Sequence, residues 1–237
     1  MTSALKHRII LVCFLGLAGS VMAQHEKSIL ITGVKAHLGN GKTMENAAIG
    51  FKDGIITDVR NANIVDVTQL NYDTIIEYKG HHLYPGFIAP NTTLGLIEIG
   101  AVRATHDERE TGKFNPNVRS IIAYNTDSRI IPTIRSNGIL TVQVSPRGGL
   151  ISGTSSIVHT EAWNWEDAAY KTDLGIHIYW PRWRHNEKAK ESRKKKVQKL
   201  DQIFLEAMAY SRKQDHELVN LKYEAMRGLF DGTKKAF

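Results

Sequence analysis

The sequence predicts an α/β protein in which a small β-module is followed by the start of a βα barrel. Short runs rich in β-branched residues, separated by turn residues, dominate the chain up to residue 84. From Pro85 onward, apolar strand-like runs alternate with helical segments, as in sheets with parallel strands. The stretch 84–95 marks the change, and its apolar run Gly86–Ala89 predicts a strand that is buried on both faces.

The N-terminus has the pattern of a secretory signal peptide over residues 1–23. Lys6 and Arg8 precede an apolar run that ends in Val-Met-Ala before Gln24. The run is short for a membrane-spanning helix, and an uncleaved anchor is the alternative. We therefore expect an exported, periplasmic protein without a stable membrane anchor. The only cysteine, Cys13, lies in this segment, so the mature chain would contain neither a disulfide nor a thiolate site.

The composition is that of an ordinary globular protein. The 237 residues are 42% hydrophobic and 23% charged, which fits one large domain or two small ones. The formal net charge of +7 falls to 7 − 2 = +5 once Lys6 and Arg8 leave with the signal peptide. Because this excess is modest and export is expected, we predict no nucleic-acid partner.

Residues 24–84 predict a small all-β module. Asp53-Gly54 separates two strand-like runs, and this dipeptide indicates a hairpin because both positions accept a positive φ. Gly39–Thr43 resembles the end of a phosphate-binding loop, but a strand rather than a helix follows it, so we interpret it as a turn. The adjacent His81 and His82 would point to opposite faces of a strand and could not share a metal ion. The expected strands are Ser28–Leu38, Ala48–Phe51, Ile55–Val59, Thr74–Tyr78 and, after a turn at Lys79-Gly80, His81–Tyr84.

The segment after the first barrel strand predicts two helices and a second strand. A polar cap at Asn115 and apolar residues further on predict a helix over 115–124. A second helix is expected to begin at Asp127-Ser128 and to close at Asn137-Gly138. The buried strand Ile139–Val144 follows directly. Strand, helix and parallel strand form the repeat of a βα barrel.

Arg147, Gly148 and Gly149 come directly after the carboxyl end of this second strand, where barrel enzymes place their active sites. Glycines there let the backbone approach a ligand, and Arg147 could pair with a carboxylate or a phosphate. A surface turn with a solvated arginine is the alternative. Further on, His177 lies in an alternating strand-like run and would point opposite to its apolar neighbours, which makes it a candidate ligand-binding residue.

The C-terminal part predicts a strand at 155–160, an aromatic turn or helix start at 163–167 and a long basic helix. Nine lysines and arginines from Arg182 to Lys199 oppose two glutamates, and apolar residues then recur at helical spacing up to Met208. We expect the basic face to be solvated, and binding to an anionic envelope surface is the alternative. A second helix is expected to end at Asp231-Gly232.

The first barrel strand resembles that of the amidohydrolase superfamily, the metal-dependent hydrolases related to imidazolonepropionase. The family pattern is Pro-Gly-hydrophobic-Ile-Asp-x-His-x-His-x-Gly. Asn91 and Thr93 stand at the two metal-binding histidine positions and Ala89 at the aspartate position. The resemblance extends over residues 28–169. The residues that match the pattern are Pro85, Gly86, Ile88, Leu94 and Gly95.

This resemblance implies an incomplete TIM-type (β/α) barrel over residues 85–237, preceded by the N-terminal strands of a small β-sandwich over residues 24–84. The C-terminal half of the barrel and of the sandwich would then be missing, together with the remaining metal ligands. A divalent metal such as zinc is expected for the family, and no metal ligand can be assigned here. The expected ligand-binding residues at the barrel mouth are Asn91, Thr93, Arg147, Gly148, Gly149 and His177.

The implied activity is hydrolysis of carbon–nitrogen bonds in a small-molecule or peptide-like substrate. In the family, a metal lowers the pKa of a bound water while an aspartate moves the proton. This chain alone is expected to be inactive. Two other interpretations stay open: a non-catalytic amidohydrolase-fold protein that binds a small polar or peptide-like ligand, and a self-sufficient structural domain.

Overall fold

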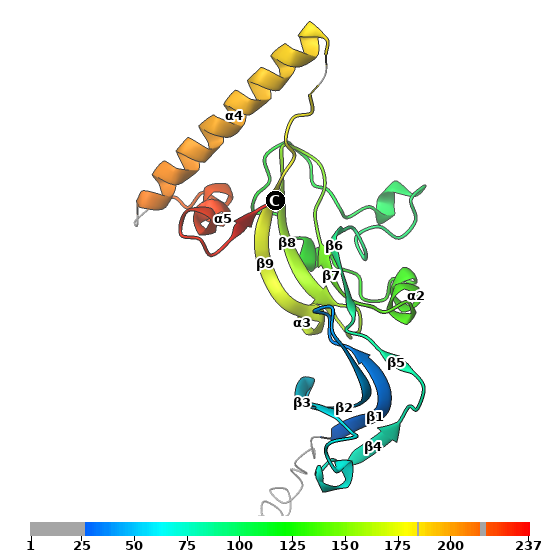
Figure 1. Cartoon of the computed structure of the whole chain (residues 1–237). Coiled ribbons are helices and arrows are strands. Elements are labelled where there is room, and N and C mark those ends of the chain that lie inside the picture. Colours follow the sequence, from blue (N-terminus) through cyan, green and yellow to red (C-terminus); the bar gives the residue numbers. More distant parts are fainter. Residues whose placement is uncertain (1–26, 184, 214–216) are drawn as a thin grey trace, which may run out of the picture. The chain divides into compact units, whose positions relative to one another are not determined.

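A computed structural model describes residues 27–183, 185–213 and 217–237 (Figure 1). The chain divides into two compact units, one ending at Pro85 and the other running from Gly86 to Phe237. We call them the N-terminal unit and the C-terminal unit. The predicted signal peptide, residues 1–23, lies outside the described residues and stays a prediction.

The N-terminal unit is one five-stranded sheet in the order β3-β2-β1-β4, with β5 also pairing with β1. β1, β2 and β3 are antiparallel neighbours, whereas β4 and β5 run parallel to β1. Val34, Ala36 and Ile49 lie in its core. The elements are β1 (Ser28–His37), β2 (Thr43–Lys52), β3 (Ile55–Asn61), the 3-10 helix η1 (Val67–Gln69), β4 (Thr74–Glu77) and β5 (His82–Leu83).

The turns of this unit follow from their residue types. Asp53 and Gly54 have φ angles of 53° and 74° between β2 and β3, which confirms the predicted hairpin. The Gly39–Thr43 stretch connects the antiparallel strands β1 and β2, so it is a turn and does not lead into a helix. At Lys79-Gly80 the chain does not reverse, because β4 and β5 pair with β1 in the same direction.

The C-terminal unit is built on a second, curved sheet in the order β10-β9-β8-β7-β6 (Figure 1). Its strands are β6 (Phe87–Thr92), β7 (Ile139–Val144), β8 (Ile151–His159), β9 (Ala169–Ile178) and β10 (Lys235–Ala236). Its helices are η2 (Arg103–Thr105), η3 (Ser120–Ala123), α2 (Ile130–Ser136), α3 (Trp165–Ala168), α4 (Glu187–Arg212) and α5 (Leu221–Phe230).

The βα repeat occurs once in this unit. β6 and β7 are parallel, and α2 lies between them in the chain, as predicted. β7, β8 and β9 are antiparallel neighbours, which departs from the repeat. The physical reason is the short link between β7 and β8, Ser145–Leu150, because a parallel crossover needs about a dozen residues or more.

The prediction of a helix over residues 115–124 is wrong, except for the single helical turn η3. The backbone before η3 is extended and pairs with β8 instead: Asn115 donates to the Ile151 carbonyl over 2.9 Å, and the Val118 carbonyl accepts from Thr154 over 2.7 Å. A backbone whose polar groups are already bound to a strand cannot also form helical hydrogen bonds.

The prediction that the strand at Gly86–Ala89 is buried on both faces is also wrong. Phe87 and Ile88 are 63% and 68% exposed. β6 is the last strand of the sheet in the described part of the chain and pairs with β7 alone. An edge strand keeps one side without a neighbour, so its apolar side chains remain in contact with water.

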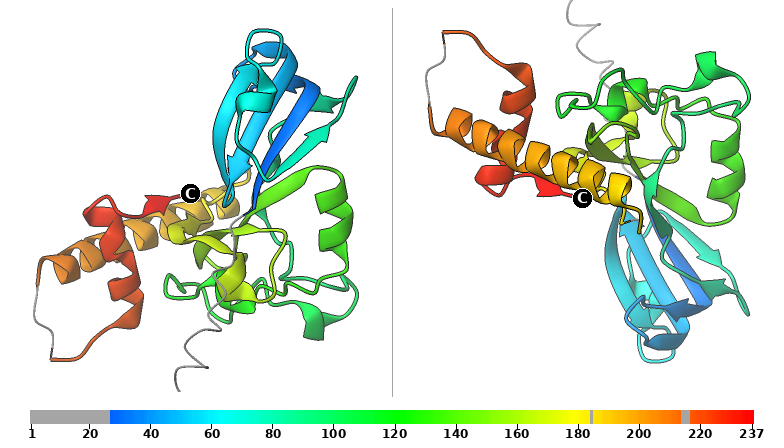
Figure 2. Two further views of the ribbon diagram at one scale, coloured as in Figure 1. Left: turned by 90° about the horizontal axis from the view of Figure 1, so that it is seen from below. Right: turned by 90° about the horizontal axis from the view of Figure 1, so that it is seen from above.

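Two apolar cores hold the C-terminal unit together. The first packs η3 and α2 against β7 and β8, through Ile121, Ile131 and Val142. The second joins α4 and α5 to β8 and β9, which is why the two helices lie side by side in Figure 2. Its buried members are Ile151, Ile176, Leu200, Ile203, Ala207 and Met226.

The predicted amphipathic helix is confirmed as α4. It begins at Glu187, where the side chain of Asn186 accepts a hydrogen bond from the Ala189 amide over 2.7 Å. Its buried residues start at Leu200, so the basic first half stands away from the core. Among the described residues, no helix is both long and apolar enough to span a membrane.

Candidate functional site

Polar side chains converge where the parallel strands β6 and β7 end. Pro90 has no amide hydrogen to donate to a neighbouring strand, and the pairing of β6 with β7 shifts between Ala89 and Thr92. Within this bulge, Asn91 adopts a φ of 52°. Bulges turn backbone groups out of the regular ladder, so the Asn91 carbonyl is available to a side chain.

The side chain of Arg147 donates a hydrogen bond to that carbonyl. Its Nη2 atom donates to the Asn91 carbonyl oxygen over 2.6 Å, and its Nη1 atom donates to the Tyr179 hydroxyl over 3.3 Å. Arg147 lies just beyond β7 and Tyr179 just beyond β9. One guanidinium therefore connects the ends of three strands and places a fixed positive charge between them.

His177 is the second ionisable group here. Its side chain lies on β9, is 6% exposed and stacks on Phe237 with ring centroids 5.1 Å apart. Its Nε2 atom is buried and has no hydrogen-bond partner in the part of the chain that the structure describes. Burial first, and then the positive charge of Arg147, lower the pKa of His177 to about 4. The imidazole is therefore neutral at neutral pH.

Gln143 is a site residue that the sequence reasoning missed. Its Oε1 atom accepts a hydrogen bond from the Asn91 amide over 3.2 Å, and its Nε2 atom donates to the Ser155 hydroxyl over 3.0 Å. Gln143 is 8% exposed, so this amide is enclosed in the sheet. A glutamine inside the apolar run Ile139–Val144 was a usable signal, because a buried polar side chain needs partners.

Glu108 was missed as well, and nothing in its irregular stretch singles it out. Its backbone carbonyl accepts a hydrogen bond from the Arg147 amide, which ties down the loop after β7. Its buried carboxylate lies 2.9 Å from Arg109 Nε and 3.8 Å from His106 Nδ1. Oε2 of this carboxylate is buried and lacks a hydrogen-bond partner within the described residues.

The structure thus brings Asn91, Arg147 and His177 together, and it places the other three predicted residues differently. Thr93 lies in the turn after β6, where its carbonyl accepts a hydrogen bond from the Leu96 amide. The Cα atoms of Gly148 and Gly149 face residues 109–113, in the segment between η2 and η3. A Cβ on Gly148 would lie 3.3 Å from Arg109 Cβ, and one on Gly149 would lie 3.0 Å from the Lys113 carbonyl oxygen.

These residues do not fit the metal centre that the family resemblance implies. Such a centre needs imidazole nitrogens or carboxylate oxygens, whereas Asn91 and Thr93 offer a neutral amide and a hydroxyl. The guanidinium of Arg147, 2.6 Å from the Asn91 carbonyl, would also repel a cation there. Among the described residues, no group of three or more histidine, cysteine or acidic side chains is arranged to hold a metal ion.

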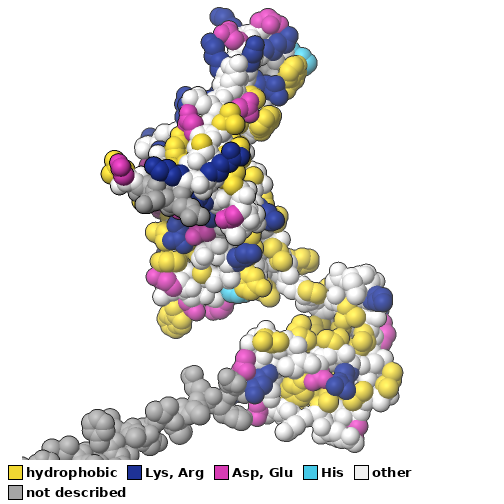
Figure 3. Space-filling model, turned by 90° about the vertical axis from the view of Figure 1, so that its left-hand side faces the viewer, with side chains coloured by type: hydrophobic (Ala, Val, Ile, Leu, Met, Phe, Trp, Pro, Cys, Tyr) yellow, Lys and Arg dark blue, Asp and Glu magenta, His cyan; other side chains and the backbone are white. Residues whose placement is uncertain are grey.

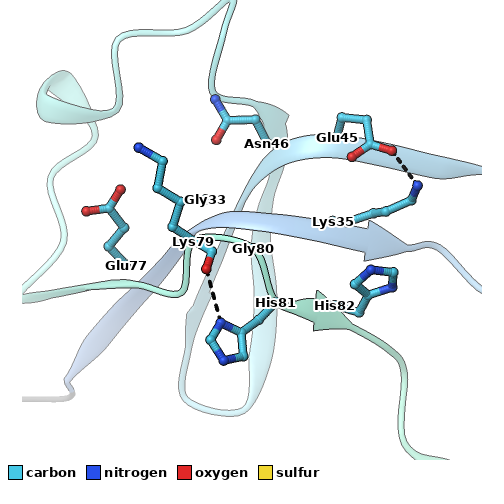
Figure 4. A pocket seen from close by; sticks show the side chains of 9 residues that line it. All are labelled: Gly33, Lys35, Glu45, Asn46, Glu77, Lys79, Gly80, His81 and His82. Carbon is cyan, nitrogen blue, oxygen red and sulfur yellow. Dashed lines mark hydrogen bonds and ion pairs between the residues drawn. The ribbon is translucent and has the colours of Figure 1, made fainter.

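A separate hollow of about 570 Å³ lies on the sheet of the N-terminal unit (Figure 4). Lys35 and Glu45 form an ion pair in it over 2.5 Å. His81 Nδ1 lies 3.2 Å from the Lys79 carbonyl, whereas the ring of His82 contacts His37 at 3.0 Å. The two adjacent histidines thus have different partners, and the hollow is an open polar surface.

Comparison with known proteins supports the fold. The sequence matches no established family profile and no curated protein. The structure is similar to an amidohydrolase from Thermotoga maritima MSB8, with a TM-score of 0.73 and 19% identity over 88% of this chain. This chain spans 57% of the length of that protein.

A second similar structure, the ochratoxinase of A. niger, has 20% identity over 33% of this chain and 18% of its own, and its TM-score of 0.28 is too low to indicate a shared fold. The first comparison confirms, at the level of the fold, the resemblance carried by residues 85–95. The chain has the fold of the N-terminal portion of an amidohydrolase.

Proposed function

We propose that this chain is the N-terminal part of an exported, periplasmic hydrolase of the amidohydrolase type, acting on carbon–nitrogen bonds of a small-molecule or peptide-like substrate. In this proposal, residues 85–237 form an incomplete TIM-type barrel, and further strands complete both the barrel and the active site. The observation that carries it is that Arg147 contacts Asn91 and acts electrostatically on His177 where β6, β7 and β9 end, in a fold similar to an amidohydrolase.

The described residues have binding roles in this proposal. Arg147 donates hydrogen bonds and carries a fixed positive charge, so it suits a substrate carboxylate or a polarised carbonyl oxygen. His177 is neutral and has an unpartnered ring nitrogen within the described part, so it can accept or donate one hydrogen bond to a substrate. Any residue that activates water would come from strands beyond those described.

The test uses a protein extended by any coding sequence that continues after Phe237. We expect the extended protein to retain zinc, iron or manganese after mild purification and to hydrolyse amide substrates, and the 237-residue chain to do neither. Elemental analysis and release of free amine from an amide library give the two readouts. If the extended protein contained no metal and released no amine, the proposed hydrolase activity would be contradicted.

A second function, non-catalytic binding of a small polar or peptide-like ligand, is favoured by one observation. Asn91 stands at a position where the family has a metal-binding histidine, and its carbonyl accepts a hydrogen bond from the Arg147 guanidinium. A guanidinium at this place suits an anionic ligand better than a metal ion. This function predicts that carboxylate-bearing dipeptides raise the melting temperature of the extended protein without being cleaved. Replacing Arg147 by methionine should abolish that rise, and an unchanged rise would exclude Arg147 as the ligand contact.

A further inference from the structure

A long groove runs along the basic half of α4. It has a volume of about 1190 Å³ and lies between the first turns of α4 and the loops at 112–114, 149–150 and 179–182. Figure 3 shows lysine and arginine side chains gathered over this part of the molecule, with hydrophobic side chains beside them. The groove adjoins the candidate site, because Tyr179 lines the groove and also accepts a hydrogen bond from Arg147.

The charge of the groove is almost entirely positive. Its one acidic lining residue, Glu191, already pairs with Lys195 over 2.7 Å. Four further basic residues line the groove without an ion-pair partner in the part of the chain that the structure describes: Lys113, Arg182, Lys188 and Lys196. Four unpaired cations around one concave surface attract an anion.

The floor of the groove is apolar. It is formed by three side chains of the core between the helices and the sheet: Ile203, which is buried in that core, and Phe114 and Leu150, which pack against it. Trp180, at the rim, is 60% exposed. An exposed aromatic rim and an apolar floor gain free energy when a ligand removes them from water.

The occupant must therefore combine an anionic group with an apolar body. A peptide fits less well, because its backbone amides and carbonyls need hydrogen-bond partners when they leave water. Among the described lining residues, only Ser192, Tyr179 and Trp180 have neutral side chains with a hydrogen-bonding group, and the indole of Trp180 can only donate. An aliphatic chain has no such requirement.

We infer that the α4 groove binds an anionic amphiphile, such as a long-chain carboxylate, with its head among Lys188, Lys196 and Arg182 and its chain along Phe114 and Leu150. This site is independent of the proposed hydrolase activity. It needs no residue of the Asn91, Arg147 and His177 cluster, so failure of either proposal leaves the other standing.

The test measures binding of monomeric dodecanoate to the full chain by calorimetry, and by the emission shift of Trp180. We expect one saturable site and a blue shift that the Trp180→Phe variant loses. Dodecanol and acetate, which carry only the chain or only the charge, should bind at least about tenfold more weakly. A Lys188→Glu/Lys196→Glu variant should also weaken dodecanoate binding about tenfold or more.

A matched variant, Lys42→Glu/Lys79→Glu, changes the net charge equally in the N-terminal unit and should bind as the unmodified protein does. Equal weakening in both double variants would overturn the inference, because it would indicate a general charge effect. The inference would likewise be overturned if a hexaglutamate peptide bound as tightly as dodecanoate. Binding to phosphatidylglycerol vesicles without binding of monomeric dodecanoate would overturn it in favour of a membrane surface.

Discussion

At the scale of single residues, Arg147 determines the electrostatics of the candidate site. Its guanidinium holds the Asn91 carbonyl and the Tyr179 hydroxyl, and its charge contributes to the lowered pKa of His177. A fixed cation beside a neutral, buried imidazole favours anionic or carbonyl-bearing ligands over metal ions. The effect of Arg147 and of burial on the pKa of His177 can be measured without knowledge of the substrate.

The lowered pKa of His177 predicts a pH-dependent stability. Between pH 6.5 and about pH 4 the unfolded chain binds a proton at this residue that the folded chain does not, so stability falls as the pH falls through this window. We expect a loss of up to about 3 kcal/mol from this residue. Urea unfolding at pH 7 and pH 4.5, followed by tryptophan fluorescence, measures it. A His177→Phe variant keeps the ring stack on Phe237 and should lose this part of the pH dependence.

Two controls separate the causes of this effect. Arg147→Met removes the neighbouring charge and should raise the pKa of His177 in an NMR titration, while burial keeps it below 6.5. His159→Gln removes an exposed histidine from the neighbouring strand β8 and is the matched control for the loss of a histidine as such. A His177 that titrates near its ordinary pKa in the unmodified protein would contradict the buried, neutral imidazole.

At the scale of the elements, β8 organises the C-terminal unit because it pairs on both sides and also receives the extended backbone before η3. Gly153 makes this contact possible. A Cβ at this position would lie 2.5 Å from the Val118 carbonyl oxygen. Because this oxygen belongs to the backbone, it cannot rotate away, and the steric clash would remain. Its φ of 140° is also one that other residues rarely adopt.

We predict that Gly153→Ala destabilises the C-terminal unit by more than about 3 kcal/mol, because the clash and the backbone strain add. All four tryptophans lie in this unit, so tryptophan fluorescence during urea unfolding measures its stability. The matched control is Gly54→Ala in the N-terminal unit, where φ is 74° and the space is empty. It should cost about 1 kcal/mol by circular dichroism and leave the tryptophan transition unchanged. Equal effects of the two variants on that transition would contradict the role of Gly153.

At the scale of the whole molecule, the sheet of the C-terminal unit has an edge at β6 that pairs with no further strand among residues 27–183, 185–213 and 217–237. Phe87, Ile88 and the neighbouring Leu140 are 63%, 68% and 46% exposed. An apolar edge strand with free backbone groups pairs readily with another strand. Further barrel strands would cover this edge in the proposed hydrolase.

The open edge predicts self-association of the 237-residue chain. We expect its mean mass in light scattering to rise with concentration, and Ile88→Lys to reduce this rise, because a charge on an edge strand opposes strand pairing. Ile64→Lys is the control: Ile64 is 82% exposed but lies in a turn outside the strands. If both variants reduced the association equally, general charge rather than the β6 edge would be responsible.

Much of the fold was predictable because it depends on local chemistry. The Asp53-Gly54 hairpin follows from two residues that accept positive φ, and α4 follows from a helical spacing of apolar residues. The positions of Arg147 and His177 were predictable too, because each lies at or just beyond the end of a strand that the sequence pattern indicates. Such features need only a residue and its near neighbours in the chain.

The sequence by itself determined most of the strands and helices, the turns, and the residues that stand where a family metal site is expected. The tertiary structure alone decided that residues 114–119 are extended, since β8 takes their hydrogen bonds. It also decided that Gln143 and Tyr179 join the site and that Arg147 occupies the Asn91 carbonyl. These features depend on partners from 32 to 56 positions away in the chain, and no local pattern encodes such partners.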